Sequence, residues 1–585
     1  MGKLDRRKFV KTAAIASFVV NASGFLEAAS GTRSNTERHT IEADPRFRLT
    51  LRRVLEGDAP RYSDEFLLAD VKPTPERRFT EYSGDLSGRY IGALATAARV
   101  YGIDVPQLDA LVERIIALQK SEGYFGTTFH FENPADADMA LLWGNGRLLV
   151  GLLEYYRFRK SGPALAASRR IGDFLVRVSP LMLSKEIRDA FGAQHFASSY
   201  ICWTQQTEGL AMLYSVTKDE QYRKLAESIA AVIERRPGDH VHGYLTSLRG
   251  VMDVHAVTGD PNLLHQCERA WQDITASPDL LLTGGVPEGW SPNNHRTEGC
   301  GEADWVRLNL QLWRATEDTK YLVSAERAIF NELAFNQFET GDFGHRVYTG
   351  TGLPAAGAAR AWWCCTLHGL RCFPDIRENA FRETKRGVSY DLPVDGKIET
   401  ASMSAVAKSD LPRTGIVRIR IKRAAKEKAT LAVRKPAWAE TVQLRIHGST
   451  SAPSMEPNYA TAERVWADGD LVEVKYEMKL RREPSSDGRE VVWYGPWLLG
   501  ASAADNASYF NELTTTNQLL GEPKAAAGAK ASAETAFSIP IAALETDYAQ
   551  AEYPDQPGRA VLRPIAEQTD QPTTSWELRF LRGKS

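Results

Sequence analysis

Cysteine is scarce in this sequence, with six residues in a chain of 585. A fold held together by disulfides needs a far denser supply, so that class of protein is excluded. Two of the six, Cys364 and Cys365, are adjacent in the chain. Adjacent cysteines rarely bond to each other because the short ring that they would close is strained. The pair therefore indicates another use of the thiols, and metal binding is the leading one.

An excess of charge of either sign is also missing. The chain has 72 basic and 74 acidic residues, which gives a formal net charge of −2. Proteins that hold nucleic acid usually present a strongly basic surface to the phosphates, so no nucleic-acid partner is expected. The apolar content of 43% is ordinary for a globular protein. The length predicts about two to four domains.

Long hydrophobic runs are absent, so no stable membrane anchor is expected. The nearest approach is at the N-terminus, where Arg6-Arg7 in a basic segment precedes a short apolar run from Thr12 to Val20. This order is typical of a twin-arginine export signal over residues 1–30, which predicts a periplasmic or secreted protein. A disordered tail with a chance arginine pair is the alternative.

Helical periodicity dominates from about residue 86 to 380. Several segments repeat one design, in which an apolar helix with an aromatic residue ends at a Thr-x-Asp type turn that can begin the next helix. They are residues 151–157, 209–219, 250–260 and 308–318, of which the last three end in the Thr-x-Asp turn itself. Helix pairs stacked in this way predict an (α/α)6 barrel over residues 40–385, with an open solenoid as the alternative.

After about residue 385 the apolar residues alternate with period two, and Gly, Pro and Asp separate the runs. The alternating segments are 415–422, 429–434, 442–446 and 471–476. They predict one or more β-sandwich domains over residues 386–585. The fold class expected for the chain is therefore α+β and multidomain.

A set of possible metal ligands stands at the end of the helical region. Glu298 and Cys300 precede a predicted helix, and the pair Cys364-Cys365 follows more than sixty residues later. One carboxylate and three thiolates suit Zn²⁺, which takes four such ligands in a tetrahedron. The alternative is a buried thiol cluster in which Glu298 only caps the helix. Upstream, the Gly- and Pro-rich loop 284–290 presents Glu288 beside Trp290.

Five motifs in one order resemble glycoside hydrolase family 127, the β-L-arabinofuranosidases. They are Gly88-Arg-Tyr-Ile-Gly-Ala-Leu94, the Glu-x-Cys of Glu298 and Cys300, the pair Cys364-Cys365, Arg434-Lys-Pro-Ala-Trp-Ala439 and Tyr494-Gly-Pro-Trp-Leu-Leu-Gly500. The resemblance runs from about residue 80 to 500. It implies a retaining exo-hydrolase in which a zinc-bound cysteine thiolate attacks the anomeric carbon of a glycan substrate.

The resemblance also implies roles for single residues. Cys364 takes the position of the nucleophile and Cys365 that of a zinc ligand, while Glu298 and Cys300 match the other two ligands. Such a mechanism needs a carboxylic acid to protonate the leaving oxygen and then to activate water. Glu288 is the candidate for this acid/base, on a loop that is shorter here than in the family.

Substrate contacts are expected from other residues. His240 and His242 fall near a sugar-contacting histidine of the family, Trp290 offers an aromatic face, and a structural role is the alternative for either histidine. His345 and His368 are weaker candidates. Another family histidine is replaced by the segment Leu141-Leu-Trp-Gly-Asn-Gly-Arg147. This departure predicts a sugar preference different from that of the named arabinofuranosidases.

Two other functions fit the same sequence. A zinc-stabilised carbohydrate-binding protein would use the four ligands to close a structural metal site. A polysaccharide lyase is a further alternative because helical barrels also host such enzymes. Lyases usually pair a tyrosine or histidine base with a charge neutraliser, and no such pair stands out here. The oligomeric state is not predicted by the sequence.

Overall fold

The protein is described here by a computed structural model. The described residues are 45–582 without 73–81, 193–198, 236–237, 278–279, 291–295, 348–351, 354–358, 412–413, 448, 452–453, 486, 503–504, 507–517, 520–523, 526–536, 543–557 and 568–575. The expected export signal, residues 1–30, lies outside the described residues.

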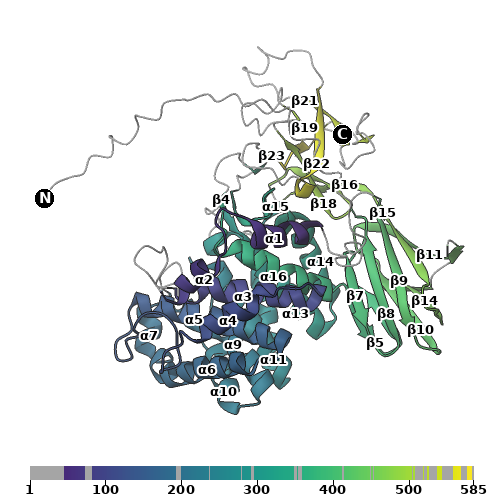
Figure 1. The fold of residues 1–585 in the computed structure, drawn as a ribbon. Helices are drawn as coiled ribbons and strands as arrows, with labels where there is room; N and C mark the ends of the chain where they lie inside the picture. Colours follow the sequence, from purple (N-terminus) through teal and green to yellow (C-terminus); the bar gives the residue numbers. More distant parts are fainter. Residues whose placement is uncertain are drawn as a thin grey trace, which may run out of the picture. The chain divides into compact units, whose positions relative to one another are not determined.

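Six of the described helices form a closed ring. They are α3 (Asp85–Tyr101), α5 (Asp136–Arg159), α9 (Gln206–Thr217), α11 (Val241–Thr258), α13 (Gly299–Thr316) and α16 (Cys365–Glu378). Each contacts the next in this order, and α16 contacts α3. One outer helix packs on each of them in turn, namely α4 (Gln107–Ile116), α6 (Gly162–Met182), α10 (Glu220–Ala230), α12 (Pro261–Ala276), α14 (Thr319–Arg327) and α1 (Pro45–Glu56) (Figure 1). This is the predicted (α/α)6 barrel, and the open solenoid is wrong.

The turns between paired helices follow the sequence prediction. The side chains of Asp219, Asp260 and Asp318 each accept a hydrogen bond from a backbone amide in the first turn of α10, α12 and α14. Each aspartate ends a Thr-x-Asp turn, so one short motif stops an inner helix and caps an outer one. Close approach of α3 and α5 depends on Gly88 and Gly151, because a Cβ atom at either residue would overlap with the backbone of the other helix.

Short elements complete the helical region. They are α2 (Asp64–Val71), α7 (Lys185–Ala190), α8 (Ile201–Thr204), η2 (Glu288–Trp290), the π-helix η3 (Ala328–Leu333), α15 (Ala334–Asn336) and a small sheet with the order β1 (Arg296–Glu298), β2 (Gly344–Val347), β4 (Ala359–Arg360). π-helices are rare in proteins, and those that occur are often found at functional sites. None of the described helices is both long and apolar enough to span a bilayer.

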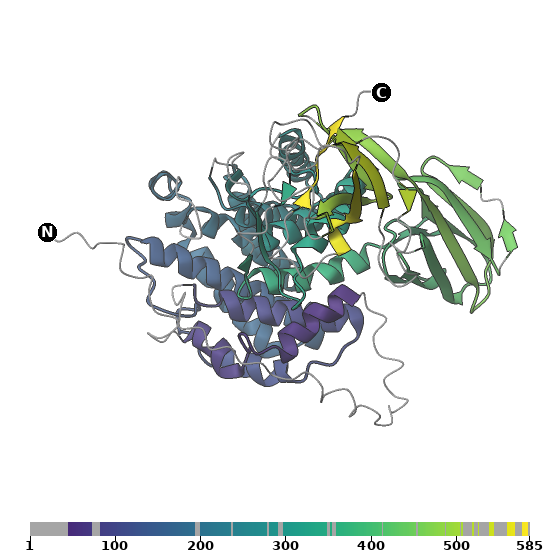
Figure 2. The same ribbon diagram turned by 90° about the horizontal axis from the view of Figure 1, so that it is seen from above.

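Two sheets after the barrel share one apolar core. One has the strand order β13 (Ser454–Glu456), β14 (Tyr459–Val465), β10 (Lys428–Arg434), β6 (Gly387–Tyr390), β5 (Phe381–Thr384). The other has the order β12 (Ser449–Ser451), β11 (Ala439–Ile446), β15 (Leu471–Met478), β9 (Ile416–Ala424), β8 (Met403–Ser409), β7 (Gly396–Glu399). Figure 2 shows the strands of this region, in green, from above. Their alternating apolar residues are buried in a single cluster, which confirms the predicted β-sandwich.

A further sheet follows the sandwich. It runs in the order β16 (Leu480–Pro484), β17 (Glu490–Tyr494), β18 (Trp497–Ser502), β22 (Gly558–Pro564), β21 (Phe537–Ala542), β19 (Gln518–Leu519), β24 (Leu581–Arg582). Strand β20 (Lys524–Ala525) pairs with β21, and β23 (Trp576–Glu577) pairs with β18 and with β3 (Gly352–Leu353). The chain is therefore an α+β multidomain protein, as its sequence predicts.

Candidate active site

Two helix N-termini bring the four predicted metal ligands together. Glu298 ends β1 and is the N-cap residue of α13, and Cys300 lies in the first turn of that helix. Cys364 is the N-cap residue of α16, and Cys365 is its first residue. Helix N-termini carry a partial positive charge, which favours thiolates and carboxylates at this place. The sequence separation between the two pairs is therefore closed by the packing of α13 against α16.

The distances between the four side chains fit a bound ion. Cys365 Sγ lies 3.6 Å from both Cys300 Sγ and Cys364 Sγ. Glu298 Oε1 lies 3.6 Å from Cys364 Sγ and 3.8 Å from Cys365 Sγ. These separations exclude disulfides, whose sulfur atoms are about 2.05 Å apart. A tetrahedral ion with metal–sulfur distances of about 2.3 Å needs ligand atoms about 3.8 Å apart. The cluster can therefore hold a metal ion.

Cys364 differs from the other two thiols of the cluster. Its exposed fraction is 8%, whereas Cys300 and Cys365 are 0% exposed. Hydrogen bonds from the thiols of Cys300 and Cys365 lower the pKa of Cys364 to about 5, against the effect of burial. Burial foremost raises the pKa of Cys300 and Cys365 well above the usual thiol range. The thiol nearest the surface is thus also the one most readily ionised.

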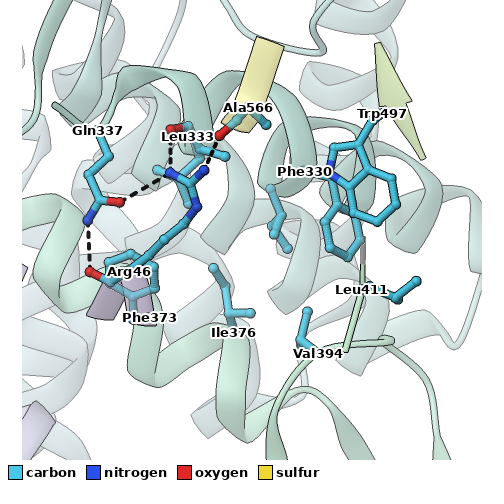
Figure 3. A pocket seen from close by; sticks show the side chains of 12 residues that line it. Arg46, Phe330, Leu333, Gln337, Phe373, Ile376, Val394, Leu411, Trp497 and Ala566 are labelled. Atoms are coloured by element: carbon cyan, nitrogen blue, oxygen red, sulfur yellow. Dashed lines mark hydrogen bonds between the residues drawn. The ribbon is translucent and has the colours of Figure 1, made fainter. Parts of the chain in front are cut away.

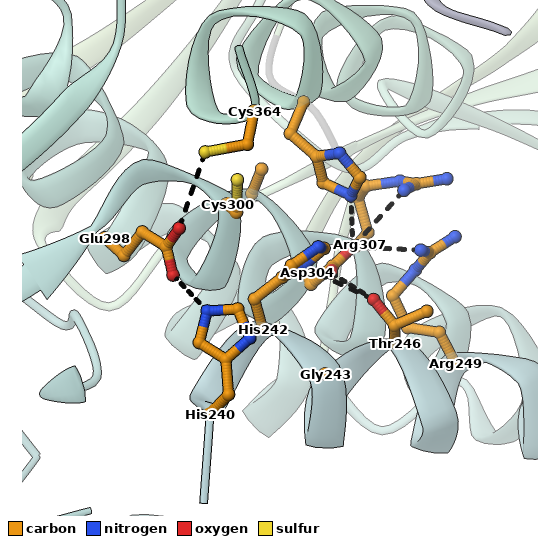
Figure 4. A network of polar contacts seen from close by, with 12 residues as sticks. His240, His242, Gly243, Thr246, Arg249, Glu298, Cys300, Asp304, Arg307 and Cys364 are labelled. Carbon is orange, nitrogen blue, oxygen red and sulfur yellow. Dashed lines mark hydrogen bonds and ion pairs between the residues drawn. The ribbon is translucent and has the colours of Figure 1, made fainter. Parts of the chain in front are cut away.

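Glu288 and His240 lie on the other side of Glu298. His240 Nε2 is 2.7 Å from Glu298 Oε2 and 3.8 Å from Glu288 Oε1. Figure 4 shows Glu298 between the Cys364 sulfur and the His240 ring. Burial raises the pKa of Glu288 to about 7 although the nearby His240 opposes the rise. Burial lowers the pKa of His240, but the carboxylates of Glu298 and Glu288 together raise it to about 9. At neutral pH Glu288 can therefore both give and take a proton.

Trp290 ends the loop that carries Glu288 in a strained backbone conformation. Its φ angle is +52° and that of Gly289 is +74°, both in the left-handed region. A bulky side chain rarely adopts this region, and such strain concentrates at functional sites. The Trp290 ring packs edge-on against Tyr244 at 5.6 Å, and Arg235 lies over it at 5.3 Å. Its buried indole N–H has no hydrogen-bond acceptor among the described residues.

His242 is engaged with the protein through both ring nitrogens. Nδ1 donates to Asp304 Oδ2 at 2.6 Å, and Nε2 accepts from Arg89 at 3.1 Å. Burial foremost lowers the pKa of His242 to about 4, so the ring is neutral and its tautomer is fixed by these partners. A substrate contact by His242 stays a prediction, and the described contacts assign it a supporting place behind His240.

Arg89 occupies the centre of a second group of possible metal ligands. Cys300, His242 and His368 have ligand atoms within 4.8 Å of one another. The Arg89 guanidinium lies 2.8 Å from His368 Nδ1 and 3.9 Å from Cys300 Sγ. A fixed cation therefore stands where an ion would otherwise sit, close to the thiolates. The sequence did not reveal this role, although Arg89 is the single charged residue of the segment 88–94.

A buried charge network lies behind this group. Asp304 accepts from Arg249 at 2.9 Å, and the network continues to Glu208. The guanidinium groups around Glu208 are those of Arg371 at 3.0 Å, Arg249 at 3.2 Å, Arg147 at 3.6 Å and Arg307 at 3.9 Å. Burial alone would raise the pKa of Glu208, but these cations hold it well below its usual range. The floor of the site is therefore ionic and fully buried.

Two further residues concern the walls of the site. His345 is paired with Glu298 across β1 and β2, and its Nδ1 lies 3.3 Å from the carbonyl oxygen of Thr297. Trp143 donates from its indole N–H to Asp85 at 2.9 Å, and its ring lies 5.8 Å from that of His240. The segment that departs from the family pattern therefore places an aromatic ring beside the site.

Two protein-family models match the sequence. Residues 70–378 match the β-L-arabinofuranosidase GH127 catalytic domain, and residues 392–478 match the GH127 middle domain. No curated protein matches the sequence of this chain.

Solved structures of low sequence identity share the fold. A GH127 β-L-arabinofuranosidase from Geobacillus stearothermophilus T6 is 18% identical with a TM-score of 0.72, covering 93% of this chain and 100% of that one. A second GH127 β-arabinofuranosidase is 18% identical with a TM-score of 0.71, covering 93% of this chain and 94% of that one. A protein described as a glycoside hydrolase is also 18% identical, with a TM-score of 0.65 and coverages of 87% and 95%.

Proposed function

This chain belongs to the GH127 β-L-arabinofuranosidase family of glycoside hydrolases, and we propose that it removes a terminal β-L-arabinofuranose or a related sugar from glycans. Cys364 is the proposed nucleophile and Glu288 the proposed acid/base. His240 and Trp290 are proposed to contact the sugar. The replacement of a family histidine by the segment 141–147 supports a sugar preference different from that of the named arabinofuranosidases.

One observation carries the proposal. The Glu298 carboxylate lies 3.6 Å from Cys364 Sγ, and one of its oxygen atoms lies within 4.8 Å of a carboxylate oxygen of Glu288. A readily ionised thiol and a carboxyl group with a pKa of about 7 therefore flank the same residue. A nucleophile beside a proton donor is the arrangement that double displacement at a sugar requires.

In the first step the Cys364 thiolate attacks the anomeric carbon. A carbon–sulfur bond forms while the glycosidic carbon–oxygen bond breaks, and the Glu288 carboxylic acid gives its proton to the leaving oxygen. In the second step the Glu288 carboxylate takes a proton from water, and the water oxygen attacks the anomeric carbon. The carbon–sulfur bond breaks, and the Cys364 thiolate and protonated Glu288 are restored.

We propose Zn²⁺ as the ion that Glu298, Cys300, Cys364 and Cys365 hold. Bound zinc would stabilise the thiolate form of Cys364 and make its sulfur a better leaving group. Metal analysis of protein kept reduced throughout should find about one zinc per chain, because three thiolates and one carboxylate form a soft tetrahedral set. Zinc-free protein that is nevertheless folded and active would contradict the ligand assignment.

The stereochemistry of the product tests the proposed function. A screen of nitrophenyl glycosides, β-L-arabinofuranoside included, first identifies a substrate. We expect proton NMR of the first-formed sugar to show retention at the anomeric carbon, because two displacements each invert that centre. An inverted product would exclude the covalent intermediate on Cys364.

We also propose that the protein is exported through the twin-arginine route, on the strength of Arg6-Arg7 and the short apolar run that follows. That route carries folded proteins, which suits a chain that must bind its metal first. Sequencing of the mature N-terminus from periplasmic and culture fractions tests this, and an uncleaved chain confined to the cytoplasm would refute it.

A further inference from the structure

The loop that carries Glu288 is fastened by two buried carboxyl groups. We call residues 280–290 the Glu288 loop. Its Thr283 hydroxyl donates to Glu332 Oε2 at 2.5 Å, and its Val286 amide donates to Glu302 Oε1 at 3.0 Å. The second oxygen of Glu332 accepts from the Thr297 hydroxyl at 3.0 Å. Glu332 therefore joins the Glu288 loop to the strand that ends in Glu298.

Glu332 lies in η3, next to a residue that faces another part of the chain. The amide oxygen of Asn331 accepts from the Leu498 backbone N–H at 2.7 Å, and its nitrogen donates to the Pro496 carbonyl at 3.0 Å. Both partners belong to the motif 494–500, which has no place in the proposed chemistry. Within one π-helical turn, Asn331 thus binds the further sheet and its neighbour Glu332 binds the Glu288 loop.

The further sheet also touches the Glu288 loop directly. Leu281 and Leu282 pack against the buried cluster that includes Trp493 and Leu498. Arg327, at the end of α14, donates to the Leu282 carbonyl at 2.9 Å and lies 4.8 Å from the centre of the Trp493 ring. These contacts and the Asn331 hydrogen bonds reach the Glu288 loop by independent routes.

The sandwich holds the same segment of the barrel. Arg434, which begins the motif 434–439, forms a buried ion pair with Glu326 of α14. A buried charge pair fixes two elements in one register, because separating them would leave both charges without a partner. The motifs 434–439 and 494–500, which both lie outside the barrel, therefore contact the segment from α14 to η3.

Packing on the remaining side of η3 is incomplete. Phe330 and Leu333 border a cavity of about 170 Å³ that also contacts Trp497 and Ala566. Figure 3 shows Phe330 beside Trp497 at this cavity, and their ring centres are 5.5 Å apart. The cavity loosens the packing on this side of η3, so the hydrogen bonds of Asn331 and Glu332 contribute more to fixing the position of the turn.

We propose that the further sheet and η3 act as a brace that positions Glu288 against Glu298 and Cys364. Glu332 is a positioning residue, and Asn331 transmits the position of the sheet to it. The proposal rests on the acid/base role proposed for Glu288. A misplacement of about 1 Å can cost a factor of about 10² in rate, so a brace of this kind matters for catalysis.

Hydrogen exchange of the full, metal-loaded chain tests the brace without a substrate. Asn331→Ala removes the two hydrogen bonds between η3 and the further sheet, and the hydrogen bonds described for Asn331 go to Arg327, Pro496 and Leu498 rather than to the Glu288 loop. We expect amides of residues 281–290 to exchange about tenfold faster, because the brace loses buried hydrogen bonds. Ser389→Ala is the matched control, since it removes a buried hydroxyl that donates to Asp391 at 3.0 Å in the sandwich. Unchanged exchange of the loop in Asn331→Ala would overturn the proposal.

A second variant, at the other end of the proposed brace, distinguishes a broken link from a general loss of stability. Thr283→Val removes only the loop's hydrogen bond to Glu332. Coupling between two sites is reciprocal, so the Leu498 amide should then exchange faster, while strand β9 stays as in the wild type. A Leu498 amide that exchanges at the wild-type rate in Thr283→Val would also overturn the brace.

Kinetics separate the brace from the proposed function. With a substrate that the wild type hydrolyses, Asn331→Ala and Thr283→Val should lower kcat about tenfold and leave KM nearly unchanged, because the ground state binds as before. A wild-type chain without glycosidase activity would refute the function alone, since the exchange results would still decide whether the sheet holds the loop.

Discussion

Replacing Cys364 with alanine is expected to lower kcat for a hydrolysed aryl glycoside by about 10⁴-fold or more, because the proposed covalent intermediate forms on the Cys364 sulfur. The variant should still fold, since Cys364 is the most exposed thiol of its cluster and the other ligands are set by α13 and α16. Steady-state kinetics and a thermal unfolding curve measured on the same preparation check both statements.

A matched control lies on the same helix. Cys372 is 0% exposed and donates to the Ala303 carbonyl, away from the cluster. Cys372→Ala should therefore keep most of the activity, although it removes as many packing atoms as Cys364→Ala does. Cys364→Ser should be folded and inactive. If Cys364→Ser unfolds, the thiol has a structural role, and a carbohydrate-binding protein with a closed metal site becomes the better reading.

Replacing Glu288 with glutamine is expected to lower kcat/KM by about 10²–10⁴-fold, the range typical for loss of a general acid. The loss should shrink for a dinitrophenyl leaving group, which departs without a proton, because the first step then no longer needs the acid. An equal loss with good and poor leaving groups would contradict the proton-donor role. Comparison of the two aryl glycosides under identical conditions decides this.

The ionisation of Glu288 and of Cys364 predicts how kcat/KM of the wild type depends on pH. Glu288 must be protonated to act as the acid, so kcat/KM should fall as the pH rises through about 7. Cys364 must be ionised to attack, and its thiol has a pKa of about 5 before any metal binds, so kcat/KM should also fall on the acidic side, at or below about pH 5. The profile should therefore be bell-shaped, and Glu288→Gln should remove the limb near pH 7.

Local signals in the sequence predicted much of the fold. The turns at Asp219, Asp260 and Asp318 were readable because a cap and the helix that it begins are neighbours in the chain. The sandwich was readable because strands with one buried face alternate with period two. Closure of the ring was only an expectation, since the contact of α16 with α3 joins segments with no local signal in common.

The candidate site was predicted only in part for a related reason. Thiols and a carboxylate at two helix starts indicate a metal by their chemistry alone. Arg89 and Glu332 act through contacts with residues that are distant in the sequence. A charged residue in an apolar helix does not by itself indicate which distant residue it contacts. The π-helical turn that carries both Asn331 and Glu332 has no distinctive sequence pattern. The roles of Arg89, Asn331 and Glu332 therefore follow only from the three-dimensional structure.

Closure of the ring has a consequence for synthesis. All four proposed ligands lie at the starts of α13 and α16, the last two inner helices to leave the ribosome, whereas α3, which packs against α16, is the first inner helix. At a translation rate of about 5–20 residues per second, α3 waits tens of seconds with one flank uncovered. A chain halted before α16 would carry Cys300 without its two partner thiols. Such a nascent chain lacks two of the four proposed ligands, and one flank of α3 stays uncovered until the last inner helix arrives.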